Sequence, residues 1–144
     1  MPARDLFHDV VKNALIKDGW TITDDPLHIR YGTLDLYIDL AAERLIGAEK
    51  AGRKIAVEIK SFTGASMIHE FHLAHGQYMS YLLALENQGF EHTLYLAVPE
   101  DTYLRFFESQ FGRDAIERFE LNLIVYQVES EAVVQWINKN NTES

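Results

Sequence analysis

The chain has 144 residues, of which 47% are hydrophobic and 24% charged, and it contains no cysteine. This size and composition predict one globular domain, over residues 1–137, followed by a frayed polar tail at 138–144. Disulfides and thiolate metal sites are excluded. No run approaches the ~18 apolar residues of a membrane span, and the N-terminus shows no apolar signal region. We therefore expect a cytoplasmic protein without a membrane segment.

The charge balance bears on the kind of partner. The chain has 13 Lys and Arg residues and 22 Asp and Glu residues, which gives a net charge of −9. This negative charge opposes non-specific attraction to nucleic acid. Contact with DNA would need a local basic patch, bound divalent cations or a more basic partner. The alternative is that the acidity only keeps the protein soluble.

The first third of the chain predicts one helix and several short strands. Residues 5–18 carry apolar side chains at helical spacing, and Gly19 follows as a stop signal. Residues 20–23 and 27–31 are typical of extended segments, separated by a turn at Asp24-Asp25-Pro26.

Residues 33–40 alternate strictly between apolar and polar side chains, which predicts a strand. Its apolar face would hold Leu34, Leu36, Ile38 and Leu40, and its polar face Asp35, Tyr37 and Asp39. Extended segments at 44–49 and 54–60 follow, joined by a predicted hairpin turn at 50–53. This meander would let Asp39 and Glu58 meet on its polar face.

The segment KIAVEIKSF, residues 54–62, contains the strongest chemical signal. Alternation places Ile55, Val57 and Ile59 on a core face, and Glu58 and Lys60 on the other face. A carboxylate and an ammonium group at this spacing on a rigid strand are typical of metal-dependent phosphodiesterases. An ordinary salt-bridged strand has the same pattern.

Residues 66–88 form the longest helical pattern, ended by Gly89. The predicted apolar stripe consists of Ile68, Phe71, His75, Met79, Leu82 and Leu85. Gln77 and Tyr81 lie four residues apart and share a face, although helix-surface residues have the same spacing. His69, His72 and His75 do not predict a three-histidine metal site, because the first and third point in different directions.

The remaining residues predict a strand at 92–98, a helix capped by Asp101 with a further turn at 114–119, a strand at 121–128 and a short arm at 132–137. Collected into main elements, the order is α-β-β-β-α-β-α-β. This order is typical of an α/β fold with a mixed central β-sheet flanked by helices.

Several runs of this sequence resemble the XisH family, named for controlling excision of the fdxN element in cyanobacteria. The resemblance covers nearly the whole chain. It is carried by FHDVVKNALIKDGW (7–20), YIDLAAE (37–43), AEKAGRKIAVEIKSF (48–62), GQYMSY (76–81), LYLAVP (94–99) and VVQWI (133–137).

That family is similar in fold to the PD-(D/E)XK nucleases, so the resemblance implies a restriction-endonuclease-like core. Asp39 then matches the motif aspartate, Glu58 the second acidic position and Lys60 the lysine. Gln77 and Tyr81 match the Q-x-x-x-Y element of the RecB-like branch. Two departures stand out: Ile38 replaces the motif proline, and Asp35 is a second candidate for the aspartate.

The implied chemistry is hydrolysis of a phosphodiester with Mg²⁺ or Mn²⁺. Asp39, Glu58 and the backbone carbonyl of Ile59 would hold the metal. Lys60 would orient or deprotonate the attacking water, and Gln77 would position a phosphate or water. Without the resemblance, Asp39, Glu58 and Lys60 also fit a cross-strand salt-bridge cluster. Glu49 is a further residue that could line the site.

Two functions of different classes follow. The first is a DNA nuclease that works with a small XisI-like partner, which would supply positive charge. The second is a non-catalytic accessory factor that assists a site-specific recombinase in excising a DNA element. A nuclease restrained by its partner, and a homo-oligomer, are further possibilities that nothing in the sequence tests.

Overall fold

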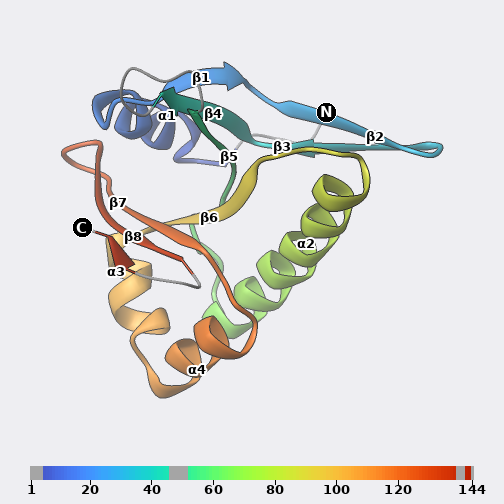
Figure 1. Ribbon diagram of the computed structural model, residues 1–144. Helices are drawn as coiled ribbons and strands as arrows, with labels where there is room; N and C mark the ends of the chain where they lie inside the picture. Colours follow the sequence, from blue (N-terminus) through green and yellow to red (C-terminus); the bar gives the residue numbers. More distant parts are fainter. Residues whose placement is uncertain (1–4, 46–51, 139–141, 144) are drawn as a thin grey trace.

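A mixed β-sheet forms the centre of the computed structural model, which describes residues 5–45, 52–138 and 142–143 (Figure 1). Its elements are α1 (His8–Lys17), β1 (Thr21–Asp24), β2 (Leu27–Tyr31), β3 (Leu34–Ile38), β4 (Leu40–Leu45), β5 (Gly52–Ile59), α2 (Met67–Asn87), β6 (Thr93–Pro99), α3 (Glu100–Thr102), η1 (Tyr103–Phe107, a π-helix), α4 (Gln110–Arg118), β7 (Leu123–Gln127), β8 (Ala132–Ile137) and β9 (Thr142–Glu143). The seven-stranded sheet has the order β1-β4-β5-β6-β7-β8-β9. β5, β6 and β7 are parallel, and the other neighbouring strands are antiparallel.

Helices cover both faces of this sheet. Val11 and Leu15 of α1 pack with Ile55 and Val57 of β5 in one cluster of buried residues. Ala56, which points to the other face, belongs to a second cluster with residues of α2. The alternation predicted for β5 is thus present, but the face that carries Glu58 lies under α2 rather than in solvent, and Glu58 is buried. A strand covered on both faces is rigid, and it can hold a side chain in a fixed position.

The segment predicted as one strand at 33–40 belongs to two strands in the structure, β3 and the start of β4. β3 pairs with β2 in a separate two-stranded ribbon, whereas β4 pairs with β1 and β5 in the main sheet. The chain must change sheets between Ile38 and Leu40, so Asp39 lies at the junction. The ribbon extends from the body of the molecule (Figure 1), and Leu34 at its end is 65% exposed rather than in the core.

The long helix forms where the sequence predicts it. Ser66 caps α2 by accepting a hydrogen bond from the N–H of His69, and Gly89 has a positive φ of 77° beyond its end. The predicted stripe is only partly correct, because Ile68 and Met79 are 42% and 48% exposed. The buried residues of α2 are Phe71, Ala74, Tyr78, Ala84 and Leu85.

The element order differs from the predicted one. Five strands, not three, separate α1 from α2, and two strands follow β7. The two additional strands are the short extended segments predicted at 20–23 and 27–31, which the three-strand order left out. β1 pairs with β4 in the main sheet, and β2 pairs with β3 in the ribbon. The helix expected after a cap at Asp101 is divided into α3, η1 and α4. Asp101 is not its cap, because the N-cap is Pro99 and Asp101 lies within α3.

The predicted tail contains the two residues of β9, which pair with β8. Half of the hairpin turn predicted at 50–53, namely Lys50 and Ala51, lies outside the described residues, as does Glu49. Gly52 and Arg53 belong to β5. In the part of the chain that the structure describes, no helix has the length and apolarity needed to cross a membrane.

Candidate functional site

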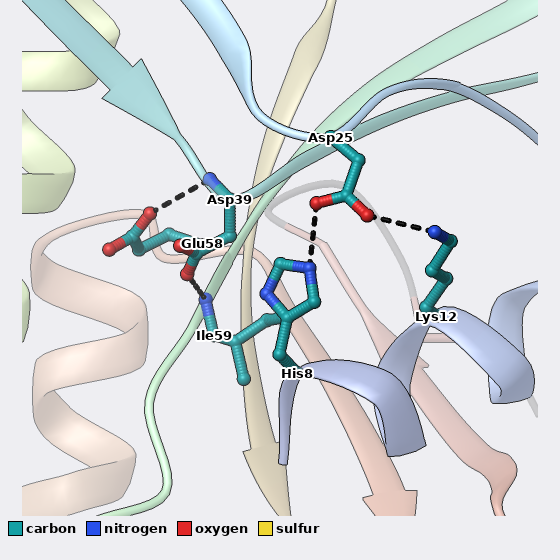
Figure 2. A network of polar contacts seen from close by, with 6 residues as sticks. All are labelled: His8, Lys12, Asp25, Asp39, Glu58 and Ile59. Carbon is teal, nitrogen blue, oxygen red and sulfur yellow. Dashed lines mark hydrogen bonds and ion pairs between the residues drawn. The ribbon is translucent and has the colours of Figure 1, made fainter. Parts of the chain in front are cut away.

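Asp39 and Glu58 hold each other in place through the backbones of their strands. Oδ2 of Asp39 accepts a hydrogen bond from the N–H of Ile59 at 2.8 Å, and Oε1 of Glu58 accepts one from the N–H of Asp39 at 3.3 Å. Figure 2 shows these two bonds, which link the junction of β3 and β4 to the end of β5. Each carboxyl group therefore uses one oxygen for the backbone and keeps a second oxygen for other partners.

Burial makes this pair of carboxyl groups electrostatically unusual. The pKa of Glu58 is raised from an ordinary value of 4.5 to about 8, first by burial and then by the negative charge of Asp39. Burial also raises the pKa of Asp39, against the opposing effect of the Ile59 N–H. Near neutral pH the pair therefore retains a proton, and a cation could take the place of that proton.

Lys60 lies next to this pair. Its Nζ is 3.7 Å from Oε2 of Glu58, and its side chain is partly exposed. Lys60 also lines a pocket of about 190 Å³ together with Asp5, Ser61, Phe62, Thr63, Glu70 and Leu73. Its amine thus lies between a buried carboxylate and a solvent-accessible pocket, where a charged ligand could reach it.

The two residues on α2 lie differently. Tyr81 is half-buried, and its pKa is raised by burial and by the negative charges of Glu58 and Asp39, which places it near the pair. Gln77, one turn earlier, is exposed. Of the predicted Q-x-x-x-Y pair, Tyr81 therefore lies near the two carboxyl groups, whereas the side chain of Gln77 is largely in solvent.

Asp35, the alternative motif aspartate, lies elsewhere on the ribbon. Its carboxylate contacts Arg30 through both oxygens at 3.1 Å and His28 at 2.7 Å, and the ring of His28 stacks on Tyr37. These bonds lower the pKa of Asp35, His28 contributing most. Asp39 is therefore the aspartate that contacts Glu58, whereas Asp35 contacts Arg30 and His28 on the ribbon.

A second polar network adjoins the pair and was not predicted from the sequence. Buried His8 on α1 contacts Oδ1 of Asp25 through Nε2 at 2.7 Å, and Lys12 donates to Oδ2 of Asp25 at 2.9 Å. In Figure 2, His8 lies between Asp25 and Ile59. The electrostatic effect of His8 opposes the rise in the pKa of Asp39. Asp25 is 17 residues from His8 in sequence, and the turn at Asp25-Pro26 carries no local signal of this contact.

The donor set fits a hard divalent cation only with added water. Among residues 5–45, 52–138 and 142–143, no three His, Asp or Glu side chains are grouped so as to hold a metal ion. Asp39 and Glu58 supply two carboxylates, and Mg²⁺ is typically bound by one or two carboxylates while it keeps several waters. Of the three histidines on α2, His69 and His72 are exposed, and His75 stacks on Phe119 at 4.2 Å.

A family model and two solved structures relate this chain to the same family. The family model described as XisH protein matches residues 1–134. The chain is similar to a crystal structure of an XisH family protein from Nostoc punctiforme, with 48% sequence identity and a TM-score of 0.83, over 93% of this chain and 100% of that chain.

A crystal structure of a fdxN element excision controlling factor protein from Anabaena variabilis gives the same identity of 48% and the same TM-score of 0.83, over 94% of this chain and 100% of that one. Comparison with curated proteins finds no match.

Proposed function

Because this chain belongs to the XisH family, we propose that it controls excision of a DNA element and carries a divalent-metal-dependent site for phosphodiester hydrolysis. The observation that carries the proposal is the buried pair of carboxyl groups beside Lys60. The carboxyl group of Glu58 is held by the N–H of Asp39, and that of Asp39 by the N–H of Ile59. Two carboxylates and a lysine on the ends of neighbouring strands also support a restriction-endonuclease-like core.

In this proposal the residues have separate tasks. Asp39, Glu58 and the backbone carbonyl of Ile59 bind Mg²⁺ or Mn²⁺, which supplies an activated water and stabilises negative charge on the phosphate. The backbone bonds that fix the two carboxyl groups keep them in place before any ligand arrives, which lowers the cost of ordering them.

Lys60 and the α2 residues act on the substrate side. From its position beside Glu58 and the pocket, the Lys60 amine neutralises charge on a bound phosphate or orients the attacking water. Tyr81 supports the carboxylate pair, and Gln77 contacts the phosphate backbone from its exposed position on α2.

The net charge of −9 favours a second candidate function. In that case the domain is a non-catalytic accessory factor that assembles with a recombinase. In both cases we expect a small XisI-like partner to provide the positive charge that DNA binding requires, since this chain has an excess of carboxylates.

The experiment is calorimetric titration of the purified chain with Mn²⁺, because it requires no knowledge of the nucleic acid substrate. We expect one site per chain in the wild type and loss of binding in Asp39→Asn and Glu58→Gln. Asp35→Asn is the matched control, since Asp35 is an exposed carboxylate on the same segment, and it should bind Mn²⁺ as the wild type does.

Nuclease activity is then measured on DNA with Mg²⁺ and the XisI-like partner present. Metal binding together with DNA cleavage that requires Lys60 supports the enzyme. Metal binding without cleavage supports the accessory factor, and a wild type that binds no Mn²⁺ rules out the metal site.

A further inference from the structure

The solvent-facing side of α2 is unusual for an exposed helix surface. In Figure 1, α2 runs along one side of the molecule. The residues on its outward side are all exposed, and none of them is Asp, Glu, Lys or Arg, in a chain that is 24% charged. We call this set the outer face of α2, and it consists of His69, His72, Leu73, Gly76, Met79, Ser80 and Leu83.

These residues follow the spacing of a helix–helix seam. Positions 69, 72/73, 76, 79/80 and 83 recur every 3.5 residues on average, which is the repeat that keeps one stripe of a helix against a partner helix. The other side of α2 has its own buried stripe, which includes Phe71, Tyr78 and Leu85. Leu73, Met79 and Leu83 are exposed apolar side chains on the outer face. Of these, Leu73 also lines the pocket that contains Lys60.

No contact within this chain requires a glycine at position 76. It lies in the middle of a 21-residue helix, where glycine is unfavourable relative to alanine. A Cβ added to Gly76 would meet nothing within 4 Å, so no neighbour in this structure requires the absence of a side chain. A glycine on an outer face permits a second backbone to approach closely.

We propose that the outer face of α2 pairs with the same face of a second copy of this chain, antiparallel, with the two-fold axis at Gly76. An isologous contact needs a self-complementary surface. Residues equidistant from Gly76 satisfy that need: Leu73 lies opposite the partner's Met79, and His69 lies opposite the partner's Leu83.

Charge selects the second copy over an unrelated partner. In this register Glu86 lies ten residues after Gly76 and Ser66, the N-cap, ten residues before it. Each Glu86 carboxylate therefore meets the positive N-terminal end of the partner's α2. The face itself carries no Asp or Glu, so two chains of net charge −9 can approach along it. The contact is about 31 Å long, which suits a concentration-dependent dimer rather than a permanent one.

The experiment is sedimentation velocity over a series of protein concentrations from low micromolar to near millimolar. We expect the wild type to dimerise reversibly and Leu83→Glu to be monomeric throughout. Leu104→Glu is the matched control, since Leu83 and Leu104 are 54% and 55% exposed and Leu104 belongs to η1 and not to α2. Gly76→Ala should raise the dissociation constant at least about tenfold, although alanine favours the helix of the monomer.

The register is tested by cross-linking, because the chain has no cysteine of its own. Under mild oxidation, a mixture of Leu73→Cys and Met79→Cys chains should form more disulfide-linked dimer than either variant alone. A wild type that stays monomeric at every concentration overturns the proposal. So does a dimer unaffected by Leu83→Glu, or equal cross-linking in the mixture and the single variants. These outcomes are independent of Mn²⁺ binding, so they leave the proposed metal site untouched.

Discussion

Glu58 shows how burial can change the chemistry of a single residue. In solution its carboxyl group would be ionised at neutral pH, but under α2 and beside Asp39 its pKa is about 8. The folded protein therefore binds a proton at Glu58 that the unfolded chain releases. This arrangement reduces stability at alkaline pH and makes the same position attractive to a cation.

The first prediction is that stability falls as pH rises through the range set by Glu58. Below about pH 4.5 the residue is protonated in both the folded and unfolded chain, so its contribution to stability is fully present. Between that value and about pH 8 only the folded state keeps the proton, and the free energy of unfolding declines by up to about 1.4 kcal/mol per pH unit.

Urea unfolding of the wild type and of Glu58→Gln across this range provides the measurement. The glutamine keeps an oxygen for the N–H of Asp39 and has no proton to lose, so its pH dependence should be flatter and its stability at about pH 8 greater than that of the wild type. Identical pH profiles for both proteins would show that the pKa of Glu58 is not raised.

At the scale of the element, the junction of η1 and α4 depends on one small residue. Ser109 caps α4 by accepting a hydrogen bond from the N–H of Gly112 at 3.1 Å. A Cβ at Gly112 would lie 2.1 Å from the carbonyl oxygen of Phe106 and 2.5 Å from Cα of Phe107. Both are backbone atoms, so no side-chain rotation can relieve the overlap. The π-helix and α4 therefore pack closely only because residue 112 is glycine.

The second prediction follows from that contact. Gly112→Ala should lower the free energy of unfolding by about 3 kcal/mol, because the backbone of η1 must move. Gly76→Ala is the control, since its Cβ meets open space, and in the monomer it should raise stability by about 0.5–1 kcal/mol. Denaturant unfolding of both variants at a concentration where the chain is monomeric checks the prediction. Equal effects of the two substitutions would contradict it.

At the scale of the whole molecule, metal binding and folding are linked. The two carboxyl groups come from strands that meet only in the folded sheet, since Asp39 and Glu58 are 19 residues apart in sequence. A cation that binds this pair binds the folded state and not the unfolded chain, so it stabilises the protein as a whole.

The third prediction is a metal-dependent shift in thermal stability. Mn²⁺ at roughly 100 times its Kd should add about 2.7 kcal/mol to the free energy of unfolding. At a fixed Mn²⁺ concentration the rise in Tm should be larger at about pH 8 than at about pH 6, because at the lower pH the metal must displace a proton. Thermal unfolding with and without Mn²⁺ measures both effects, and Asp39→Asn should show neither. An equal rise in the wild type and Asp39→Asn would place the metal elsewhere.

Local patterns in the sequence determined the existence of α2 and β5 and the α/β class. Hydrophobic periodicity and capping residues act over a few positions, so they can be identified without knowing the rest of the fold. The family resemblance, carried by these and other runs, is confirmed by the comparisons.

Only the tertiary structure decided where these elements meet. The chain changes sheets at Asp39 because β3 and β4 find different partners, and no alternation within 33–40 encodes that choice. The same applies to the contact of His8 with Asp25 and to the burial that raises the pKa of Glu58. These features depend on contacts between residues distant in sequence, which the path of the whole chain determines and a local pattern does not contain.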